Sequence, residues 1–229
     1  MISGISAGAI NAFAMSLFEK GDEVAMAEYM KTLAETMITS DVFTFWPGDL
    51  YGVLNGLLNE RGIFDDSPLL DYLQNIYEEF KKKNGTPVLK RKIVIGSVDS
   101  QTAELKTFTE ALEPESDFPH AVQCSASIPG AFDFQSFSGG EMIDGSTAWD
   151  TNIASAVKRC FEIVDSEDKI TMDVILLNQK EIDVANKTGN SIENYFRYLD
   201  IKGNYKIMND VYEVQKEYPK VNYRYLQIP

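Results

Sequence analysis

Residues 4–8 read Gly4-Ile5-Ser6-Ala7-Gly8, and this G-x-S-x-G pentapeptide decides how the rest of the sequence is interpreted. Apolar residues recur with helical spacing directly after the serine, so the pentapeptide predicts a sharp turn into a helix over residues 7–20. The two glycines allow such a turn because they carry no Cβ atom that could clash. The same five residues also fit a Gly/Ser-rich loop that caps a helix, so the motif alone leaves both interpretations open.

Short apolar runs alternate with amphipathic segments along the rest of the chain, which predicts an α/β fold. We expect three layers, α/β/α, with a largely parallel central sheet. The predicted helices cover residues 7–20, 22–37, 67–83, 118–127, 153–162 and 191–218, the last with a break at Gly203. The predicted strands cover residues 92–98, 105–108, 141–143, 172–177 and 221–228.

The length of 229 residues fits a single domain over 1–229. Within it, residues 179–229 are expected to form a C-terminal helical extension and a last strand. Residues 39–66 differ from the rest because aromatic residues stand there among glycines and prolines. This composition suits a lid or an acyl-chain wall, with Trp46 in contact with a lipid interface, and it equally suits ordinary core packing under a long loop.

Composition excludes several functional classes. Lys and Arg number 21 against 35 Asp and Glu, which gives a net charge of −14 and argues against binding nucleic acid or anionic lipid. No apolar run is long enough to span a membrane, and no basic stretch follows Met1, so we expect a cytoplasmic protein with at most peripheral membrane contact. Cys124 and Cys160 form no C-x-x-C pair, and no metal-ligand spacing or nucleotide-binding motif occurs, so neither a metal nor a cofactor is expected.

A serine nucleophile needs a base, and the chain offers few candidates. His120 is the only histidine, and its place at the start of a predicted helix favours a surface or capping role. Asp144 is the stronger candidate, since it ends a short apolar strand and Gly145 after it permits close backbone approach. An Asp-Gly pair on its own is more typical of a simple tight turn. The rival carboxylates are Asp99, Asp150 and Asp173, of which Asp99 at the end of a strand is the most serious.

A third segment, Cys124-Ser125-Ala126-Ser127-Ile128-Pro129-Gly130-Ala131-Phe132, places small residues at the end of a predicted helix. With the pentapeptide in residues 3–12 and with Asp144-Gly145-Ser146, in this order and at these separations, the chain resembles the patatin-like phospholipase family. The resemblance extends from residue 1 to about residue 178. The first segment and the Ile-Pro-Gly segment are specific when taken together, whereas Asp-Gly alone is not.

The resemblance implies an acyl hydrolase with a Ser-Asp dyad, in which Ser6 is the nucleophile and Asp144 the general base. Gly4, Ala7 and Gly8 would then form the elbow and contribute to the oxyanion hole. Further support for the site would come from Gly145, Ile128 and Pro129. The substrate would be a lipid or phospholipid, reached by transient contact with a membrane surface; the oligomeric state is left open.

The sequence departs from the family pattern in two places. The family motif around the base is usually Asp-Gly-Gly or Asp-Gly-Ala, and Ser146 stands in its third position. The family's glycine-rich oxyanion loop does not occur before the pentapeptide, so the fold is expected to be an N-terminally truncated member. Three alternatives follow: a weakened or inactive lipid-binding or storage protein, a conventional esterase that uses His120, and an acyltransferase with an acceptor other than water.

Overall fold

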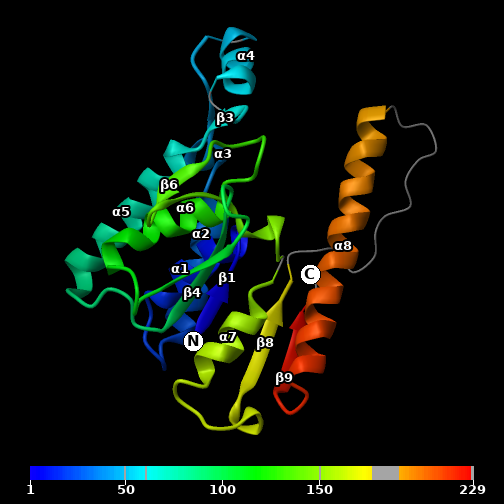
Figure 1. Ribbon diagram of the computed structural model, residues 1–229. Helices are drawn as coiled ribbons and strands as arrows, with labels where there is room; N and C mark the ends of the chain where they lie inside the picture. The colour runs from blue at the N-terminus through cyan, green and yellow to red at the C-terminus, as the bar shows by residue number, and fades with distance from the viewer. Residues whose placement is uncertain (49, 60, 150, 177–190, 228–229) are drawn as a thin grey trace. The chain divides into compact units, whose positions relative to one another are not determined.

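The computed structural model describes residues 1–48, 50–59, 61–149, 151–176 and 191–227 (Figure 1). It divides into two compact units, Met1–Ala148 and Trp149–Pro229, which are described separately. The helical elements of the first unit are α1 (Ala7–Ser16), α2 (Glu23–Thr36), α3 (Thr39–Val42), α4 (Leu50–Leu58), α5 (Ser67–Asn84), α6 (Phe118–Ala126) and the 3₁₀ turns η1 (Glu115–Asp117) and η2 (Gly145–Thr147). Its strands are β1 (Ile2–Gly4), β2 (Thr44–Phe45), β3 (Phe64–Asp65), β4 (Ile93–Asp99), β5 (Leu105–Thr109), β6 (Gln135–Phe137) and β7 (Gly140–Asp144).

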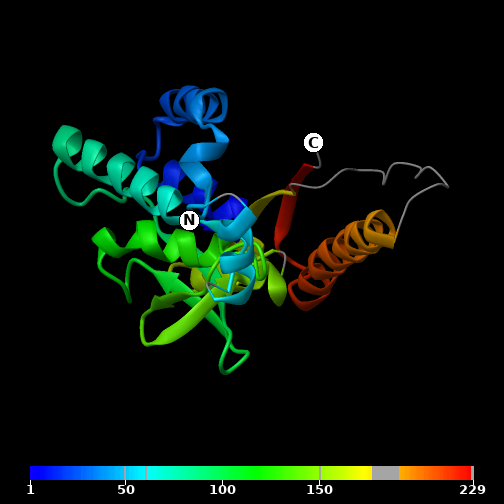
Figure 2. The same cartoon turned by 90° about the horizontal axis from the view of Figure 1, so that it is seen from above.

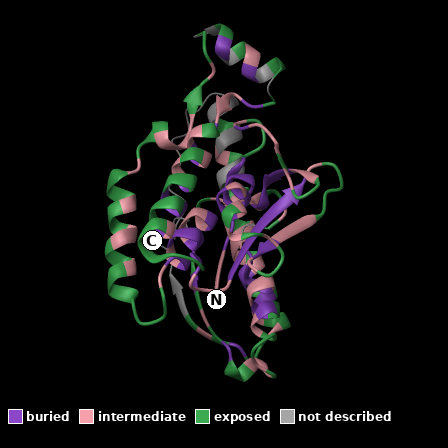
Figure 3. Cartoon of the chain, turned by 90° about the vertical axis from the view of Figure 1, so that its left-hand side faces the viewer, coloured by how far each residue is buried: buried purple, intermediate pink, exposed green. Residues whose placement is uncertain are grey.

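The central strand of the first unit is β4, whose seven residues are all buried, as Figure 3 shows in purple. Its neighbours are β1, which runs parallel to it, and β5 and β7, which run antiparallel, while β6 pairs with β7. The predicted α/β fold is therefore confirmed, with a sheet that is mixed. The β4–β5 and β6–β7 pairs are antiparallel because a short connection joins the two strands of each pair, and a short connection can only reverse the chain.

The two edges of β4 are used differently. Strand β5 pairs along one edge, from Val94 to Val98. The other edge is shared, since β1 pairs with residues 93–95 and β7 with residues 97–99. Strands β1 and β7 therefore meet end to end along the same edge of β4, and their carboxyl ends approach each other from opposite directions.

Helices α1 and α6 contact each other and the sheet, and α5 lies alongside α6 (Figures 1 and 2). Their apolar faces build one core with β4, in which the largest fully buried side chains include Phe13, Phe118, Leu73 and Ile95. Helix α5 begins one residue earlier than a capping Ser67 would place it: Asp66 is the N-cap and Ser67 is the first helical residue, followed by Pro68.

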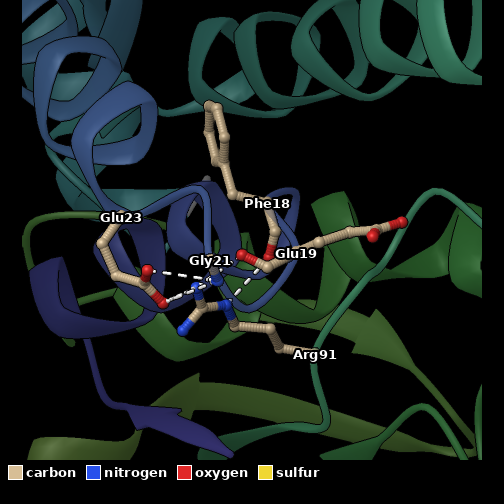
Figure 4. A network of polar contacts seen from close by, with 5 residues as sticks. All are labelled: Phe18, Glu19, Gly21, Glu23 and Arg91. Atoms are coloured by element: carbon tan, nitrogen blue, oxygen red, sulfur yellow. Dashed lines mark hydrogen bonds and ion pairs between the residues drawn. The ribbon is translucent and has the colours of Figure 1, made fainter.

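Arg91, just before β4, fixes the chain segment that follows α1 (Figure 4). Its Nε donates to the Phe18 carbonyl at 2.8 Å, and one terminal nitrogen donates to the Glu19 carbonyl at 2.8 Å and to Glu23 at 3.0 Å. Glu23 in turn accepts from the Gly21 N–H, and this bond, more than the ion pair, lowers the pKa of the Glu23 carboxyl. A planar guanidinium can satisfy several carbonyls near a helix end at once, which ties α1 to the sheet.

The second unit contains β8 (Thr171–Ile175), β9 (Asn222–Gln227), α7 (Ile153–Cys160), the 3₁₀ turn η3 (Glu167–Lys169) and α8 (Ser191–Glu217). Strands β8 and β9 are parallel. Together with α7 and α8 they form a small apolar core that belongs to the second unit. Helix α8 continues through Gly203, so the expected break there is wrong. Residues 177–190, at the start of the predicted C-terminal extension, lie outside the described residues, and a single domain over 1–229 stays a prediction.

Candidate active site

Ser6 stands at the bend between β1 and α1, as the N-cap of the helix. Its backbone has φ 55° and ψ −127°, a conformation that L-residues rarely adopt and that functional sites often hold under strain. Gly4 makes the bend possible, because a Cβ built there would lie 2.0 Å from the Gly8 carbonyl oxygen. A Cβ at Gly8 would meet nothing within 4 Å, so only the first glycine of the motif is required by packing.

Ser125 holds this bend from the neighbouring helix α6. Its hydroxyl accepts from the Ser6 N–H at 3.0 Å and donates to the Gly96 carbonyl of β4 at 2.5 Å. Ser125 is fully buried, so both bonds are shielded from water. A single hydroxyl therefore links the elbow, the central strand and α6.

Asp144 ends β7 and is fully buried. One carboxylate oxygen accepts from the Ser146 N–H at 2.8 Å, and the Asp144 N–H donates to the Ser127 carbonyl at 2.8 Å. The bond from residue 146 comes from its backbone, so any residue except proline could make it, and serine in place of the family's usual residue leaves it intact. Ser97 of β4 adds a further tie, because its hydroxyl donates to the Ile143 carbonyl at 2.6 Å.

The strand register brings the two segments together. Gly4 lies opposite Ile95 and Asp144 opposite Ser97 on the same edge of β4, so about 7 Å of strand separates the two positions. The residues that follow β1 and β7, Ile5 and Gly145, lie in direct contact. A Cβ built on Gly145 would lie 2.5 Å from the Gly96 oxygen and 3.1 Å from Cγ2 of Ile5. The residue before Ser6 thus packs against the residue after Asp144.

The first turn of α1 faces the same bend. The first hydrogen bond of the helix runs from the Ala9 N–H to the Ser6 carbonyl at 2.8 Å. The N–H groups of Ala7 and Gly8 precede that bond, and such groups at a helix N-terminus attract negative charge. Ser6 is half-buried and Ala7 is exposed, so this end of the helix is open to a ligand from solvent.

A second carboxylate, Asp66, lies under the site. It is buried, and it accepts from the Ser127 hydroxyl at 3.2 Å and from the Gln135 amide at 3.2 Å. Burial raises the pKa of Asp66 to about 6, an effect that the bond from Ser127 partly offsets. Because the Ser127 carbonyl also binds Asp144, Asp66 supports the proposed base through one intervening residue.

The rival residues have other partners. The His120 ring lies 4.9 Å from the Phe137 ring, near the start of α6, and burial lowers its pKa. It stands five residues, about 7.5 Å along the helix axis, before the serine that touches the elbow. Asp99 accepts from the Gln101 and Thr102 N–H groups in a turn, which lowers its pKa. Asp173 pairs with Arg224 in the second unit, and Asp150 lies outside the described residues.

Ile128 and Pro129 form an exposed turn directly after Ser127. The Ile128 carbonyl accepts from the N–H groups of Ala131 and Phe132, at 3.0 and 2.9 Å. The turn therefore extends the backbone that contacts Asp144, without reaching Ser6 through any described hydrogen bond. Within the described residues, no three His, Cys, Asp or Glu side chains form a metal-binding group.

Three supporting residues were missed by the sequence analysis: Ser125, Gly96 and Asp66. Ser125 stood inside a segment chosen for its small residues, but nothing in the sequence indicated that its hydroxyl would reach Ser6. Gly96 is the single glycine in a buried strand, which is a recognised sign of close backbone approach. Asp66 precedes a Ser-Pro helix start, where an aspartate is typically an ordinary cap.

Comparison with known proteins gives one informative match. A family model described as patatin-like phospholipase matches residues 1–157. No curated protein matches this chain. Among solved structures, VipD from Legionella pneumophila is similar at 14% identity and a TM-score of 0.28, over 92% of this chain and 60% of that chain. This chain spans less than two thirds of that neighbour's length.

Proposed function

Because the chain belongs to the patatin-like phospholipase family, we propose that it is a lipid acyl hydrolase that cleaves fatty-acyl esters through Ser6 and Asp144. Family membership confirms the resemblance inferred from residues 3–12, 125–132 and 144–146, and it supports lipid acyl hydrolysis as the general activity. The assignment of Ser6 as nucleophile and Asp144 as base is the more specific part of the proposal. The observation that carries it is the end-to-end meeting of β1 and β7 on one edge of β4, with Ile5 packed against Gly145.

In the proposed reaction, Asp144 accepts the proton of the Ser6 hydroxyl as Oγ forms a bond with the ester carbonyl carbon. The N–H groups of Ala7 and Gly8 stabilise the negative charge on the carbonyl oxygen. The ester C–O bond then breaks, and the departing alcohol oxygen takes the proton from Asp144. Water attacks the acyl-enzyme, gives a proton to Asp144 and releases the fatty acid, after which the proton returns to Ser6.

Burial supports Asp144 as the base in this scheme. A carboxylate is a weak base in water, and it becomes more effective where water is excluded. Asp144 is fully buried while Ser6 is half-buried, which fits a base shielded from water and a nucleophile that the substrate can reach. The substrate is a neutral or zwitterionic lipid ester, because the net charge of −14 disfavours anionic ligands.

Labelling with a fluorophosphonate probe tests the dyad. We expect the native chain to be labelled, Ser6→Ala to lose all labelling, and Asp144→Asn to lose it by about 10²- to 10⁴-fold. Asp99→Asn and His120→Gln are matched controls that should keep the native rate. Labelling that survives in Ser6→Ala contradicts the nucleophile, and a dependence on His120 favours the conventional esterase.

The same variants separate hydrolysis from binding alone. A chain that binds lipid vesicles but neither reacts with the probe nor hydrolyses a p-nitrophenyl ester would be the lipid-binding or storage protein considered above. Release of acyl product to an added alcohol in preference to water would indicate acyl transfer.

Among the described residues, no helix combines the length and apolar character that a membrane span requires.

A further inference from the structure

Helix α4 lies at one extremity of the first unit (Figure 1), and several of its large apolar side chains are exposed. Tyr51, Leu54 and Leu58 follow the i, i+3, i+7 spacing that places residues on one helix face. Together with Phe45 of β2 they form what we call the apolar tip. Their exposed fractions are 63% for Phe45, 74% for Tyr51, 48% for Leu54 and 79% for Leu58.

The opposite face of α4 is packed, so the exposure of the apolar tip is built into the fold. Gly52 and Gly56 lie against Trp46, since Cβ atoms there would approach the Trp46 carbonyl oxygen to 2.1 Å and its ring to 2.7 Å. The indole Nε1 of Trp46 donates to the Gly62 carbonyl at 3.0 Å. Trp46 is thus half-buried as a support for the helix, and the outward-facing positions belong to the residues of the apolar tip.

The apolar tip is attached to the segment that contacts the proposed base. The N–H groups of Ile63 and Phe64 donate to the carbonyls of Gly130 and Ala131, at 3.3 and 2.9 Å. The Phe64 ring lies between those of Phe43 and Phe45, at centroid distances of 4.6 and 5.1 Å. Because residues 130 and 131 follow Ser127 closely, the tip and the Asp144 contact share one short piece of backbone.

Charge indicates which kind of surface the apolar tip fits. Asp49 is the only charged residue between positions 42 and 59, in a chain whose net charge is −14. An uncharged patch on an acidic protein gains nothing from anionic lipid and suits a neutral or zwitterionic one. The four side chains expose on the order of 500 Å² together, which is less than the about 800 Å² per partner that a stable protein interface buries.

We propose that the apolar tip is a docking surface for zwitterionic phospholipid bilayers. This proposal rests on the proposed function, which favours lipid over another apolar partner. It specifies that the protein encounters its lipid substrate in a bilayer. Apolar side chains on one helix face bind an interface in proportion to the area that they bury there. Tyr51 is suited to the headgroup level, and Phe45, Leu54 and Leu58 are suited to the acyl boundary.

The test measures binding without turnover. The full chain with Ser6→Ala is mixed with phosphatidylcholine vesicles, and the bound fraction is determined by flotation. We expect binding, and we expect Leu54→Asp with Leu58→Asp to weaken it at least about tenfold. The matched control is Val24→Asp with Leu112→Asp, which adds the same charge at two exposed apolar positions outside the tip and should leave binding unchanged.

Hydrolysis of a soluble p-nitrophenyl ester by the tip variant with Ser6 intact shows that this variant is folded and separates the two proposals. Native ester turnover by a chain with the unaltered tip that does not bind vesicles overturns the docking surface and leaves the hydrolase. Binding without ester turnover leaves the docking surface and overturns the hydrolase. Equal binding by the tip and control variants, binding only to anionic vesicles, or a dimer that the tip variant dissociates would each overturn the docking proposal. If the aspartates unfold the chain, Leu58→Ser repeats the comparison at the most exposed position.

Discussion

Ser125 joins three parts of the site through one hydroxyl, so its loss should be felt at Ser6. We predict that Ser125→Ala destabilises the chain by about 1–3 kcal/mol, because the Ser6 N–H and the Gly96 carbonyl lose their buried partner. Ester hydrolysis should fall by more than stability alone explains, since the strained backbone of Ser6 loses its support. Denaturant unfolding and turnover check this, with exposed Ser136→Ala as the control; equal activity in the two variants would contradict the role of Ser125.

The raised pKa of Asp66 predicts how the stability of the chain changes with pH. The pKa is about 6 in the folded chain and 3.8 ordinarily, so between these values the folded state binds more protons. Stability from this group is therefore present below pH 4 and is lost as the pH rises toward 6. Asp66→Asn should stabilise the chain at pH 8 relative to pH 4, by at most on the order of 3 kcal/mol.

Thermal or denaturant unfolding at several pH values measures the effect of Asp66→Asn. Asp71→Asn, at an exposed position of α5, is the control for the loss of one carboxylate. The charge of the neighbouring Asp65 also raises the pKa of Asp66. A gain at pH 8 no larger than at pH 4 would mean that Asp66 is better hydrated than its burial indicates.

At the scale of elements, the elbow makes the two glycines of the pentapeptide unequal. Gly4→Ala should prevent folding or abolish probe labelling, because its Cβ would overlap the Gly8 carbonyl oxygen. Gly8→Ala should fold and be as stable as the native chain or up to about 1 kcal/mol more stable, since alanine favours a helix and meets no obstacle there. Circular dichroism, melting and labelling of the two variants compare them, and a folded, reactive Gly4→Ala would show that the elbow can relax.

Elements with strong periodicity could be predicted from the sequence. Helix α5 extends from Ser67 to Asn84 against a prediction of 67–83, and β4 from Ile93 to Asp99 against 92–98. Glycine at position 203 did not break α8, because one glycine costs only about 1 kcal/mol in a long helix. Helix α4 and strands β2, β3 and β6 were not predicted, since each is short and strand formation depends more on packing context than on local preference.

The candidate site was predictable in its parts but not in its assembly. Ser6 and Asp144 carry local signals, a G-x-S-x-G elbow and an Asp-Gly at a strand end. Which strand lies beside which is a tertiary property, so the meeting of β1 and β7 on one edge of β4 could not be derived from spacing. The support from Ser125 and Asp66 could not be predicted for the same reason, because each contacts the site across more than fifty positions of sequence.

At the scale of the whole molecule, the excess of acidic residues should act on substrate choice at a distance. With a net charge of −14, we predict that kcat/KM for an anionic soluble ester rises several-fold when salt is raised from about 50 to 500 mM, as screening weakens the repulsion. For a neutral ester of the same chain length it should change little. Parallel salt responses for the two esters would show that the potential near Ser6 does not follow the net charge.

Because β1 and β7 meet end to end, the register of β7 on β4 determines where the carboxylate of Asp144 lies. A slip of β7 by a single position along β4 would shift Asp144 by about 3.3 Å and turn its carboxylate to the other side of the sheet. The same slip would turn Met142 away from the core, so it would cost stability as well as the proton acceptor. An added or deleted residue near the β6–β7 connection is therefore expected to abolish hydrolysis even in the fraction of the protein that still folds.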